Sequence, residues 1–319
     1  MGYVVVGAGA VGGVIGARLA LAGVDVTLVA RGAHLEAIRS GGLVLESPTG
    51  RATARPRVAG TPYDVDWSEQ HVVLLAVKGQ QTAAALRDLA AAAPPSTPVV
   101  SVQNGVANEV AVLRHFARTY GICVMQPCAH LEPGVVVQQC DPVPGLLDIG
   151  RFPSGVDELC TAVAGDLRRA GFESVPRPDI MAWKRRKLLM NLGNVVDACF
   201  IDSPDADELV ALARTEGEAV LRAAGVAVTS EADDRERRGD LLRGRALADA
   251  GGSTWQSLAR ATGDIETDLL NGEVVLLGRL HGVPVPVNEA LQRVGADAAR
   301  RGLAPRSLDA AGLLAHVPR

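Results

Sequence analysis

The stretch YVVVGAGAVGGVIGARLALAGVDVTLVA, residues 3–30, decides the fold of this chain. Residues 3–6 form a short apolar run, residues 11–22 have helical spacing, and residues 24–30 form a second apolar run. Gly23 follows the helical segment, at the position of a C-terminal cap. A strand, a helix and a strand in one short unit form a βαβ motif, which requires a parallel sheet.

The same order continues downstream. Residues 71–77 (HVVLLAV) form a continuous apolar run, residues 81–93 an Ala-rich helical segment, and residues 98–102 (PVVSV) a further strand. Continuous rather than alternating apolar runs indicate strands that are covered on both faces. We therefore expect an N-terminal α/β domain of the Rossmann type, with a doubly wound parallel sheet.

The second half of the chain has a different pattern. From residue 180 onward strand signals almost disappear, and helical segments are predicted at 181–200, 204–225, 231–250, 254–281 and 287–301. Pro176 and Pro178 lie where a linker is expected. The sequence thus predicts a Rossmann domain over residues 1–178 and an all-α domain over residues 179–319.

Composition excludes several classes of protein. The 319 residues carry a formal net charge of −4 without a Lys/Arg cluster with interleaved aromatic residues, so we expect no nucleic-acid partner. Five cysteines, an odd number without a C-x-x-C pair, predict reduced thiols in a cytoplasmic protein and no metal site. No segment is both long and apolar enough for a membrane span. The sequence leaves the oligomeric state open, a homodimer included.

A G-x-G-x-x-G loop joins the first strand to the first helix: Gly7, Ala8, Gly9, Ala10, Val11 and Gly12. In a dinucleotide site the first glycine permits the tight turn, the second lets the backbone approach the pyrophosphate, and the third lets helix and strand pack closely. The helix N-terminus adds N–H groups for phosphates. In a chain with 35 glycines the spacing alone is weak support, but its place between strand and helix favours dinucleotide binding over a structural turn.

The end of the second strand indicates which dinucleotide binds. An NAD site places an acidic residue there to hold the ribose 2′-hydroxyl. Here Val29-Ala30-Arg31 carries no acid, and Asp25 lies at the opposite end of the strand. Arg31 can pair with a 2′-phosphate, whereas the structural alternative is an exposed loop arginine. The sequence therefore predicts NADP(H).

Polar residues follow two of the predicted strands. Lys78 comes after residues 71–77, and Asn104 after residues 98–102. Because ligands bind at the carboxyl ends of the strands in doubly wound sheets, we expect both residues to contribute to the cofactor or substrate site. A surface lysine and an Asn-Gly turn are the structural alternatives.

The first helix of the second half carries a polar stripe. Lys184, Lys187, Asn191 and Asn194 are spaced for one face of a helix over residues 181–200. Such a stripe usually faces solvent, but the intervening leucines and methionine indicate a helix buried on most sides. A lysine in that setting would have a lowered pKa and could donate a proton near neutral pH.

A second polar group lies at the start of a later helix. Ser253 and Gln256 fit a capping box. Hydroxyls at a helix N-terminus, here Ser253 and Thr254, also suit a substrate carboxylate. Glu266 belongs to the next helical face, where Asn271-Gly272 suggests the close approach of another helix.

In their order and spacing these pieces resemble the ketopantoate reductase (2-dehydropantoate 2-reductase) family over nearly the whole chain. The matching pieces are the glycine loop, Arg31, Val77-Lys78, Gln103-Asn104-Gly105-Val106, Lys187-Leu188-x-x-Asn191, and Ile265-Glu266-x-Asp268-x-x-Asn271-Gly272 followed by Gly282-Val283-Pro284. The resemblance implies a Rossmann domain and a helical domain, with the active site in the cleft between them.

The resemblance also implies a role for each candidate residue. Hydride would pass from NADPH to the carbonyl carbon of a 2-oxo acid, foremost 2-dehydropantoate, while Lys187 acts as the general acid. Glu266 would bind a substrate hydroxyl or orient Lys187, and Lys78 would line the nicotinamide end. The residues implied in holding substrate are Asn104, Asn191, Asn194, Ser253 and Thr254, with Asn104 also at the cofactor.

Three positions depart from the family pattern. Thr254, with Ser253 beside it, stands at the usual serine for the substrate carboxylate. Val195 stands where a second asparagine is common, with Asn194 before it, and Ala107 replaces a frequent glycine. These departures leave open a reductase of the same fold that acts on another oxo acid or an imine. A non-catalytic NADP sensor is a further alternative, which the implied catalytic set disfavours.

Overall fold

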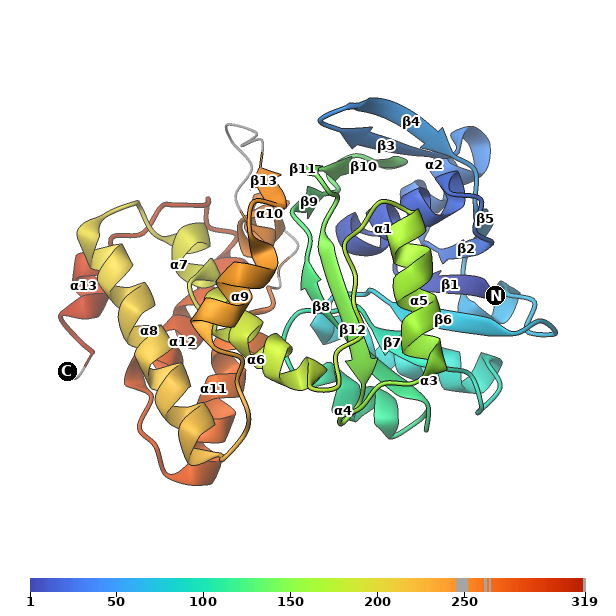
Figure 1. The fold of residues 1–319 in the computed structure, drawn as a ribbon. Coiled ribbons are helices and arrows are strands. Elements are labelled where there is room, and N and C mark those ends of the chain that lie inside the picture. Colours follow the sequence, from blue (N-terminus) through green and yellow to red (C-terminus); the bar gives the residue numbers. More distant parts are fainter. Residues whose placement is uncertain (245–251, 261–262, 264, 318–319) are drawn as a thin grey trace. The chain divides into compact units, whose positions relative to one another are not determined.

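The structure is a computed structural model that describes residues 1–244, 252–260, 263 and 265–317 (Figure 1). The chain forms two compact units. The first unit comprises residues 1–184 and the described part of 232–246, and the second comprises residues 185–231 and the described residues after 251. The sequence places the boundary after residue 178, six residues before the end of the first unit's main segment.

The first unit contains a seven-stranded sheet in the order β12-β8-β7-β6-β1-β2-β5. The strands are β1 (Gly2–Val6), β2 (Val26–Val29), β5 (Arg57–Ala59), β6 (His71–Leu75), β7 (Val99–Ser101), β8 (Thr119–Met125) and β12 (Leu146–Arg151). Neighbours pair in parallel except for β12, which runs antiparallel to β8 at the edge. The prediction of a parallel, Rossmann-type sheet is confirmed.

Both faces of this sheet are buried. In β1, Tyr3 and Val5 belong to one apolar core, and Val4 and Val6 belong to the other. Helices α1 (Ala10–Leu21) and α5 (Glu158–Arg169) contribute to the first core, whereas α3 (Thr82–Ala92) and α4 (Asn108–Leu113) contribute to the second. This double covering explains why the strand sequences are apolar at every position rather than at alternate positions.

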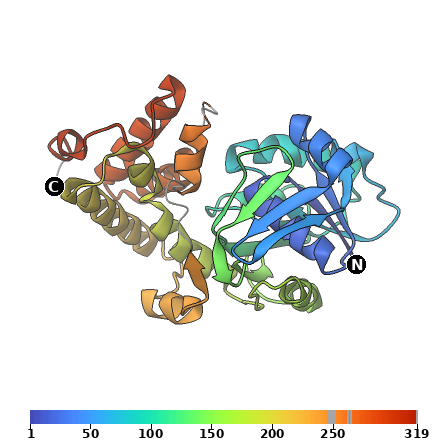
Figure 2. The ribbon, with the colours of Figure 1, turned by 90° about the horizontal axis from the view of Figure 1, so that it is seen from above.

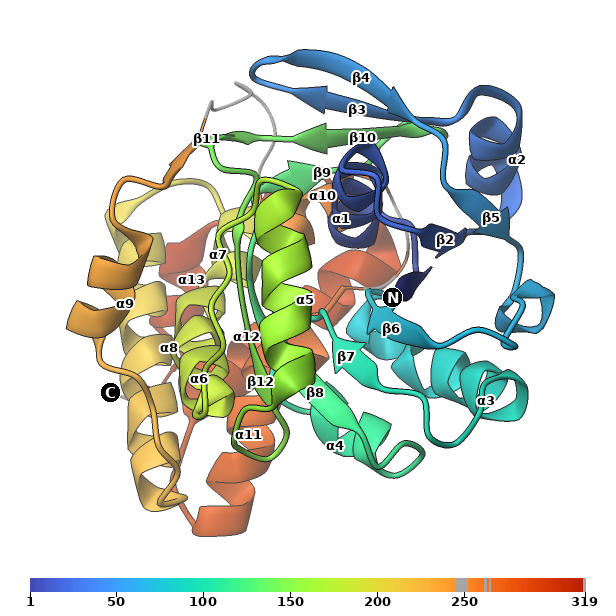
Figure 3. The same cartoon turned by 45° about the vertical axis from the view of Figure 1, so that its right-hand side comes forward.

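A second sheet, which the sequence did not predict, packs against α1 on the side away from the main sheet (Figure 3). Its order is β4-β3-β10-β9, with β3 (Leu43–Ser47), β4 (Gly50–Ala54), β9 (Cys128–Ala129) and β10 (Val135–Gln138). Gly13 makes the contact possible, because a Cβ there would lie 2.6 Å from Val136 Cγ1. Helix α2 (Gly32–Gly41) precedes β3.

Residues 232–244 return to the first unit, and the prediction of a helix over residues 231–250 is confirmed for residues 231–238 but wrong for residues 239–244. Helix α9 (Glu231–Arg238) is followed by strand β13 (Leu242–Gly244), which pairs antiparallel with β11 (Cys140–Pro142). Arg237 binds Asp148 with two hydrogen bonds of 2.8 and 3.0 Å, and Arg177 binds the same carboxylate. The hydrogen bonds and charge of Asp148 raise the pKa of Arg237. No local sequence pattern predicts these long-range ion pairs.

The second unit is helical in its described residues, as predicted. Its elements are the C-terminal part of α6 (Ile180–Asn191), and α7 (Asn194–Cys199), α8 (Pro204–Ala223), α10 (Ser253–Ala259), α11 (Thr267–His281), α12 (Pro286–Arg301) and α13 (Ala310–Leu314). Helix α8 contacts α7, α11, α12 and α13 (Figure 2). Gly272 lets α11 approach α12, since a Cβ there would lie 2.7 Å from Gln292, which confirms the close approach expected at Asn271-Gly272.

Two helix boundaries differ from the prediction. The helix predicted over residues 181–200 breaks between Asn191 and Asn194, and the one predicted over residues 254–281 consists of α10 and α11. Among the described residues, no helix combines the length and apolar character that a membrane crossing requires.

Candidate functional site

The three glycines of the loop Gly7 to Gly12 differ in what a side chain at each position would meet. Gly7 has a φ of +103°, and a Cβ there would lie 2.8 Å from the backbone nitrogen of Val77. A Cβ at Gly12 would collide with the carbonyl oxygen of Gly7 and would lie 2.8 Å from Ala76 Cβ. At Gly9, in contrast, no atom lies within 4 Å of the Cβ position. Two glycines are therefore required by the fold, and the third faces open space.

The N-terminus of α1 lies at this open space. Gly9 is the N-cap residue, no side chain caps the helix, and its first turn contains no acidic residue. The first N–H groups of a helix carry partial positive charge and have no partner within the helix. The chemistry of this terminus therefore fits the pyrophosphate of a dinucleotide.

The tip of β2 carries a cation and no acid. Arg31 is the N-cap residue of α2, with a side chain that is 72% exposed and 3.6 Å from Asp88 on α3. Asp25, at the opposite end of β2, pairs with Arg57 at 2.6 Å. These positions fit a cofactor with a negative charge at its ribose, with Arg31 as the residue that would meet it.

Lys78 and Asn104 follow neighbouring parallel strands, β6 and β7. The side chain of Gln103 joins the two strand ends, because its Nε2 donates to the Val77 carbonyl at 2.9 Å and to Thr82 Oγ1 at 2.8 Å. Lys78 and Asn104 are both half-buried. The structure thus places both residues at one edge of the sheet, as predicted.

Further buried hydrogen bonds fix the turn after β7. Thr82 Oγ1 donates to Asn108 Oδ1 at 2.8 Å, and Asn108 Nδ2 donates to the Asn104 carbonyl at 3.1 Å. Gly105 has a φ of +79°, which confirms a turn at Asn104-Gly105. The turn and the functional interpretation are compatible, because the turn fixes the backbone that carries the Asn104 side chain.

Lys184 binds residues of the first unit. Its ammonium group donates to the carbonyls of Gln103 and Ile122 at 2.7 and 3.1 Å, and it pairs with Glu109 Oε1 at 2.8 Å. All three of these partners belong to the first unit. Lys184, Lys187 and Asn191 keep the predicted spacing on α6, and the prediction of one shared helix face is wrong only for Asn194, which lies on α7.

The remaining polar residues of that stripe lie on two helices. Lys187 is half-buried, and Asn191 is buried at the end of α6. Asn194 begins α7, so it does not continue the same helix face. At the break, Asn271 Nδ2 on α11 donates to the Leu192 carbonyl at 3.1 Å.

The candidates around α10 and α11 also belong to the second unit. The predicted capping box is wrong, because Gly252 is the N-cap residue of α10 and Ser253 is already its first helical residue. Thr254 is buried, while the side chain of Ser253 lies outside what the structure describes. Glu266 is buried and is the N-cap residue of α11.

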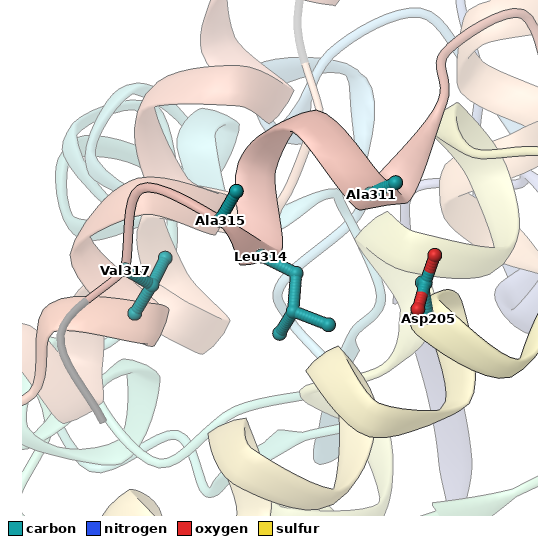
Figure 4. Close-up of a pocket in the computed structure, with 5 residues that line it drawn as sticks. All are labelled: Asp205, Ala311, Leu314, Ala315 and Val317. Atoms are coloured by element: carbon teal, nitrogen blue, oxygen red, sulfur yellow. The ribbon is translucent and has the colours of Figure 1, made fainter.

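Two further features bear on chemistry. Cys199 is buried, and burial raises the pKa of its thiol to about 11, which keeps the thiol protonated near neutral pH. A pocket of about 340 Å³ in the second unit is lined by Asp205 and by four apolar residues, Ala311, Leu314, Ala315 and Val317 (Figure 4). None of the predicted site residues lines this pocket.

Sequence reasoning missed residues that support the site rather than form it. Gln103 stands in the motif next to Asn104 and could have been singled out there. His34, which binds the glycine loop, lies on a helix that the sequence did not predict, and Glu109 carries no local signal for its partner.

Comparisons with known proteins agree with the sequence resemblance. The family model described as Ketopantoate reductase PanE/ApbA matches residues 3–154, and the model described as Ketopantoate reductase PanE/ApbA C terminal matches residues 179–296. The 2-dehydropantoate 2-reductase of Mesorhizobium japonicum is 32% identical over an alignment of 325 positions, gaps included, that covers 91% of this chain and 95% of that protein.

A further relative and a crystal structure are also similar to this chain. The 2-dehydropantoate 2-reductase of Pyrococcus horikoshii is 33% identical over 187 residues, which cover 59% of this chain and 60% of that protein. The PanE/ApbA family ketopantoate reductase from Ralstonia eutropha has a TM-score of 0.80 at 27% identity, over 95% of this chain and 99% of that chain. Since both family models match and together span most of its length, the chain belongs to the ketopantoate reductase family and is an oxidoreductase.

Proposed function

We propose that this chain uses NADPH to reduce a 2-oxo acid to its 2-hydroxy acid, with 2-dehydropantoate as the substrate. The observation that carries the proposal is the match of both family models, one over the glycine loop and Asn104, the other over Lys187 and Glu266. The open Cβ position at Gly9 and the uncapped helix behind it support the binding of the pyrophosphate.

Arg31 would hold the 2′-phosphate of the cofactor. Its side chain is largely exposed and already pairs with a carboxylate, Asp88, at 3.6 Å. A guanidinium group can bind phosphate through two parallel hydrogen bonds, so the cofactor phosphate is a stronger partner than a single distant carboxylate. The absence of an acid at this strand end removes the group that would repel the phosphate.

Lys187 would act as the general acid. When bound, the reduced nicotinamide supplies a hydride to the substrate carbonyl carbon. The ammonium group of Lys187 would polarise the carbonyl oxygen and transfer a proton to it as negative charge develops there. Asn191 lies one turn later on α6, at a spacing that places it on the same helix face, where it would orient the substrate. Glu266 would bind a substrate hydroxyl or orient Lys187.

The decisive experiment measures NADPH oxidation with a panel of 2-oxo acids that includes 2-dehydropantoate. Lys187→Ala should abolish turnover and leave the Kd for NADPH unchanged, and Lys187→Arg should also lose turnover because guanidinium is a poor acid. Arg186→Ala is the matched control, since Arg186 binds the Thr229 carbonyl and Glu218. Turnover by Lys187→Ala at the wild-type rate would refute the assignment.

A second candidate is the reduction of another oxo acid or of an imine by the same machinery. The position of Asn194 favours this second candidate. Asn194 begins α7 and does not continue the helix face of Lys187 and Asn191. The same panel of substrates, extended by imines, separates the two candidate functions. If kcat/KM for another oxo acid or an imine is at least about tenfold higher than for 2-dehydropantoate, that compound is the substrate.

A further inference from the structure

His34 connects the glycine loop to the second sheet of the first unit. It lies in the first turn of α2, three residues after Arg31. Its Nε2 lies 2.8 Å from the carbonyl oxygen of Ala8, inside the loop, and its Nδ1 accepts a hydrogen bond of 2.9 Å from the backbone N–H of Gly134. One imidazole ring thus joins segments that are 26 and 100 residues away in sequence.

These two partners determine the protonation state of the ring. The Gly134 N–H can only donate, so Nδ1 must be the acceptor and carry no hydrogen. The Ala8 carbonyl can only accept, so Nε2 must carry the hydrogen. Only the neutral Nε2–H tautomer satisfies both contacts, and the imidazolium form would place two N–H groups against each other at Gly134.

The surroundings of His34 favour that neutral form. Burial and the neighbouring His130, whose ring centroid lies 4.2 Å away, lower the pKa of His34. His130 is itself held, with its Nδ1 2.9 Å from the Val135 carbonyl. Gly134, directly before β10, has a φ of +79°, and a Cβ there would lie 2.9 Å from Ala37 Cβ, so glycine at this position permits the close approach of the backbone to α2.

We infer that His34 is a positioning residue for the dinucleotide, which it serves by holding the Ala8 carbonyl and thereby the turn between Gly7 and Gly9. Ala8 is the residue at which the chain passes from β1 to the open space at Gly9. A hydrogen bond from Nε2 fixes the orientation of the Ala8–Gly9 peptide, whose N–H belongs to the phosphate-binding terminus. This inference rests on the proposed binding of a dinucleotide at the loop.

Two isosteric substitutions separate this role from a purely structural one. His34→Gln keeps a donor at the ε position for Ala8 but loses the acceptor for Gly134. His34→Asn keeps an acceptor at the δ position for Gly134 but does not reach Ala8. His115→Asn, at an exposed histidine, is the matched control. For each variant the Kd values for NADPH and NADH are measured by titration of nicotinamide fluorescence, together with Tm and kcat at saturating cofactor.

The expected result is a Kd for both nucleotides that is about tenfold weaker in His34→Asn, the loss of about one hydrogen bond, and within about threefold of wild type in His34→Gln. The kcat at saturation should stay unchanged. Equal Kd values for the two variants, whatever their Tm, would overturn the inference. A loss confined to NADPH would also overturn it, because it would assign His34 to the 2′-phosphate. Failure of the unmutated protein to bind either nucleotide would instead refute the proposed function.

Discussion

The ammonium nitrogen of Lys184 lies 2.8 Å from Glu109 Oε1, and the side chains of both residues are almost completely buried, at 2% and 0% exposure. The pair lies over Gly121 of β8, where a Cβ would come within 3.2 Å of the carboxylate. Lys184 also holds the Gln103 carbonyl, directly before Asn104. Lys184, which belongs to the polar stripe predicted from the sequence, therefore anchors the strand end that carries a candidate binding residue.

Breaking this ion pair should destabilise the protein more than removing it entirely. Lys184→Met leaves Glu109 buried without a counter-ion, and we expect the free energy of unfolding to fall by about 3–5 kcal/mol. The double variant Lys184→Met, Glu109→Leu should recover much of that loss, because no buried charge remains. Denaturant unfolding measures both values, and a double variant no more stable than the single one would contradict the explanation.

The glycine loop offers a test that separates folding from binding. Gly9→Ala should leave the free energy of unfolding unchanged or raise it by up to about 1 kcal/mol, because its Cβ meets no atom within 4 Å. Its affinity for NADPH should nevertheless fall at least about tenfold, since the new methyl group occupies the approach of the pyrophosphate. Gly12→Ala should instead lose about 1–3 kcal/mol of stability through overpacking. Thermal unfolding and nucleotide titration distinguish the two, and similar effects of both variants would contradict this division.

Arg31 should determine the preference between the two nicotinamide dinucleotides. Arg31→Ala is expected to weaken NADPH binding about tenfold and to leave the Kd for NADH unchanged, because only NADPH carries the 2′-phosphate. Asp88→Asn should strengthen NADPH binding by up to about threefold, since it removes the carboxylate 3.6 Å from the guanidinium. Arg39→Ala, an exposed arginine that pairs with Glu36, is the control. Equal losses for NADH and NADPH in Arg31→Ala would exclude a 2′-phosphate contact.

Stability should depend on pH through His34. Burial and His130 lower its folded-state pKa below the ordinary value of 6.5, so on acidification the unfolded chain binds this proton before the folded protein does. The stabilisation is therefore fully present above pH 6.5 and is lost as the pH falls from 6.5 through the folded-state pKa. His34→Gln should show a shallower decrease of unfolding free energy in this range, whereas His115→Gln should keep the wild-type slope. Urea unfolding at a series of pH values measures the slope.

The sequence predicts the elements whose signals are local. The run of residues 3–30 specifies β1, α1 and β2, and the apolar segments before Lys78 and Asn104 specify β6 and β7. The second sheet gives no such signal, because β4 is largely exposed and β10 pairs with β3 from about ninety residues away. Its close packing on α1 uses the absence of a side chain at Gly13, which no periodicity encodes.

Site residues follow the same rule. Spacing and the chemistry that a phosphate requires predict the loop glycines and Arg31 as cofactor residues, and this stays a prediction. The break after Asn191 was not predicted, and the carbonyl of Leu192 at the break is bound by Asn271, about eighty residues downstream, which no helical spacing indicates. The partner of Lys184 was not predicted for a similar reason, since helical spacing reveals which residues share a face but not that a carboxylate such as Glu109 is buried opposite.

The carboxylate of Asp148 receives Arg177, just before the chain leaves the first unit, and Arg237, after it has returned. During synthesis on the ribosome, more than fifty residues after residue 177 must therefore be added before Asp148 can pair with its second cation, Arg237. A fragment ending at residue 184 would also expose the edge of β11 that β13 covers. The N-terminal part is thus completed by residues translated after part of the second unit has already emerged, and truncations should be designed with this order in mind.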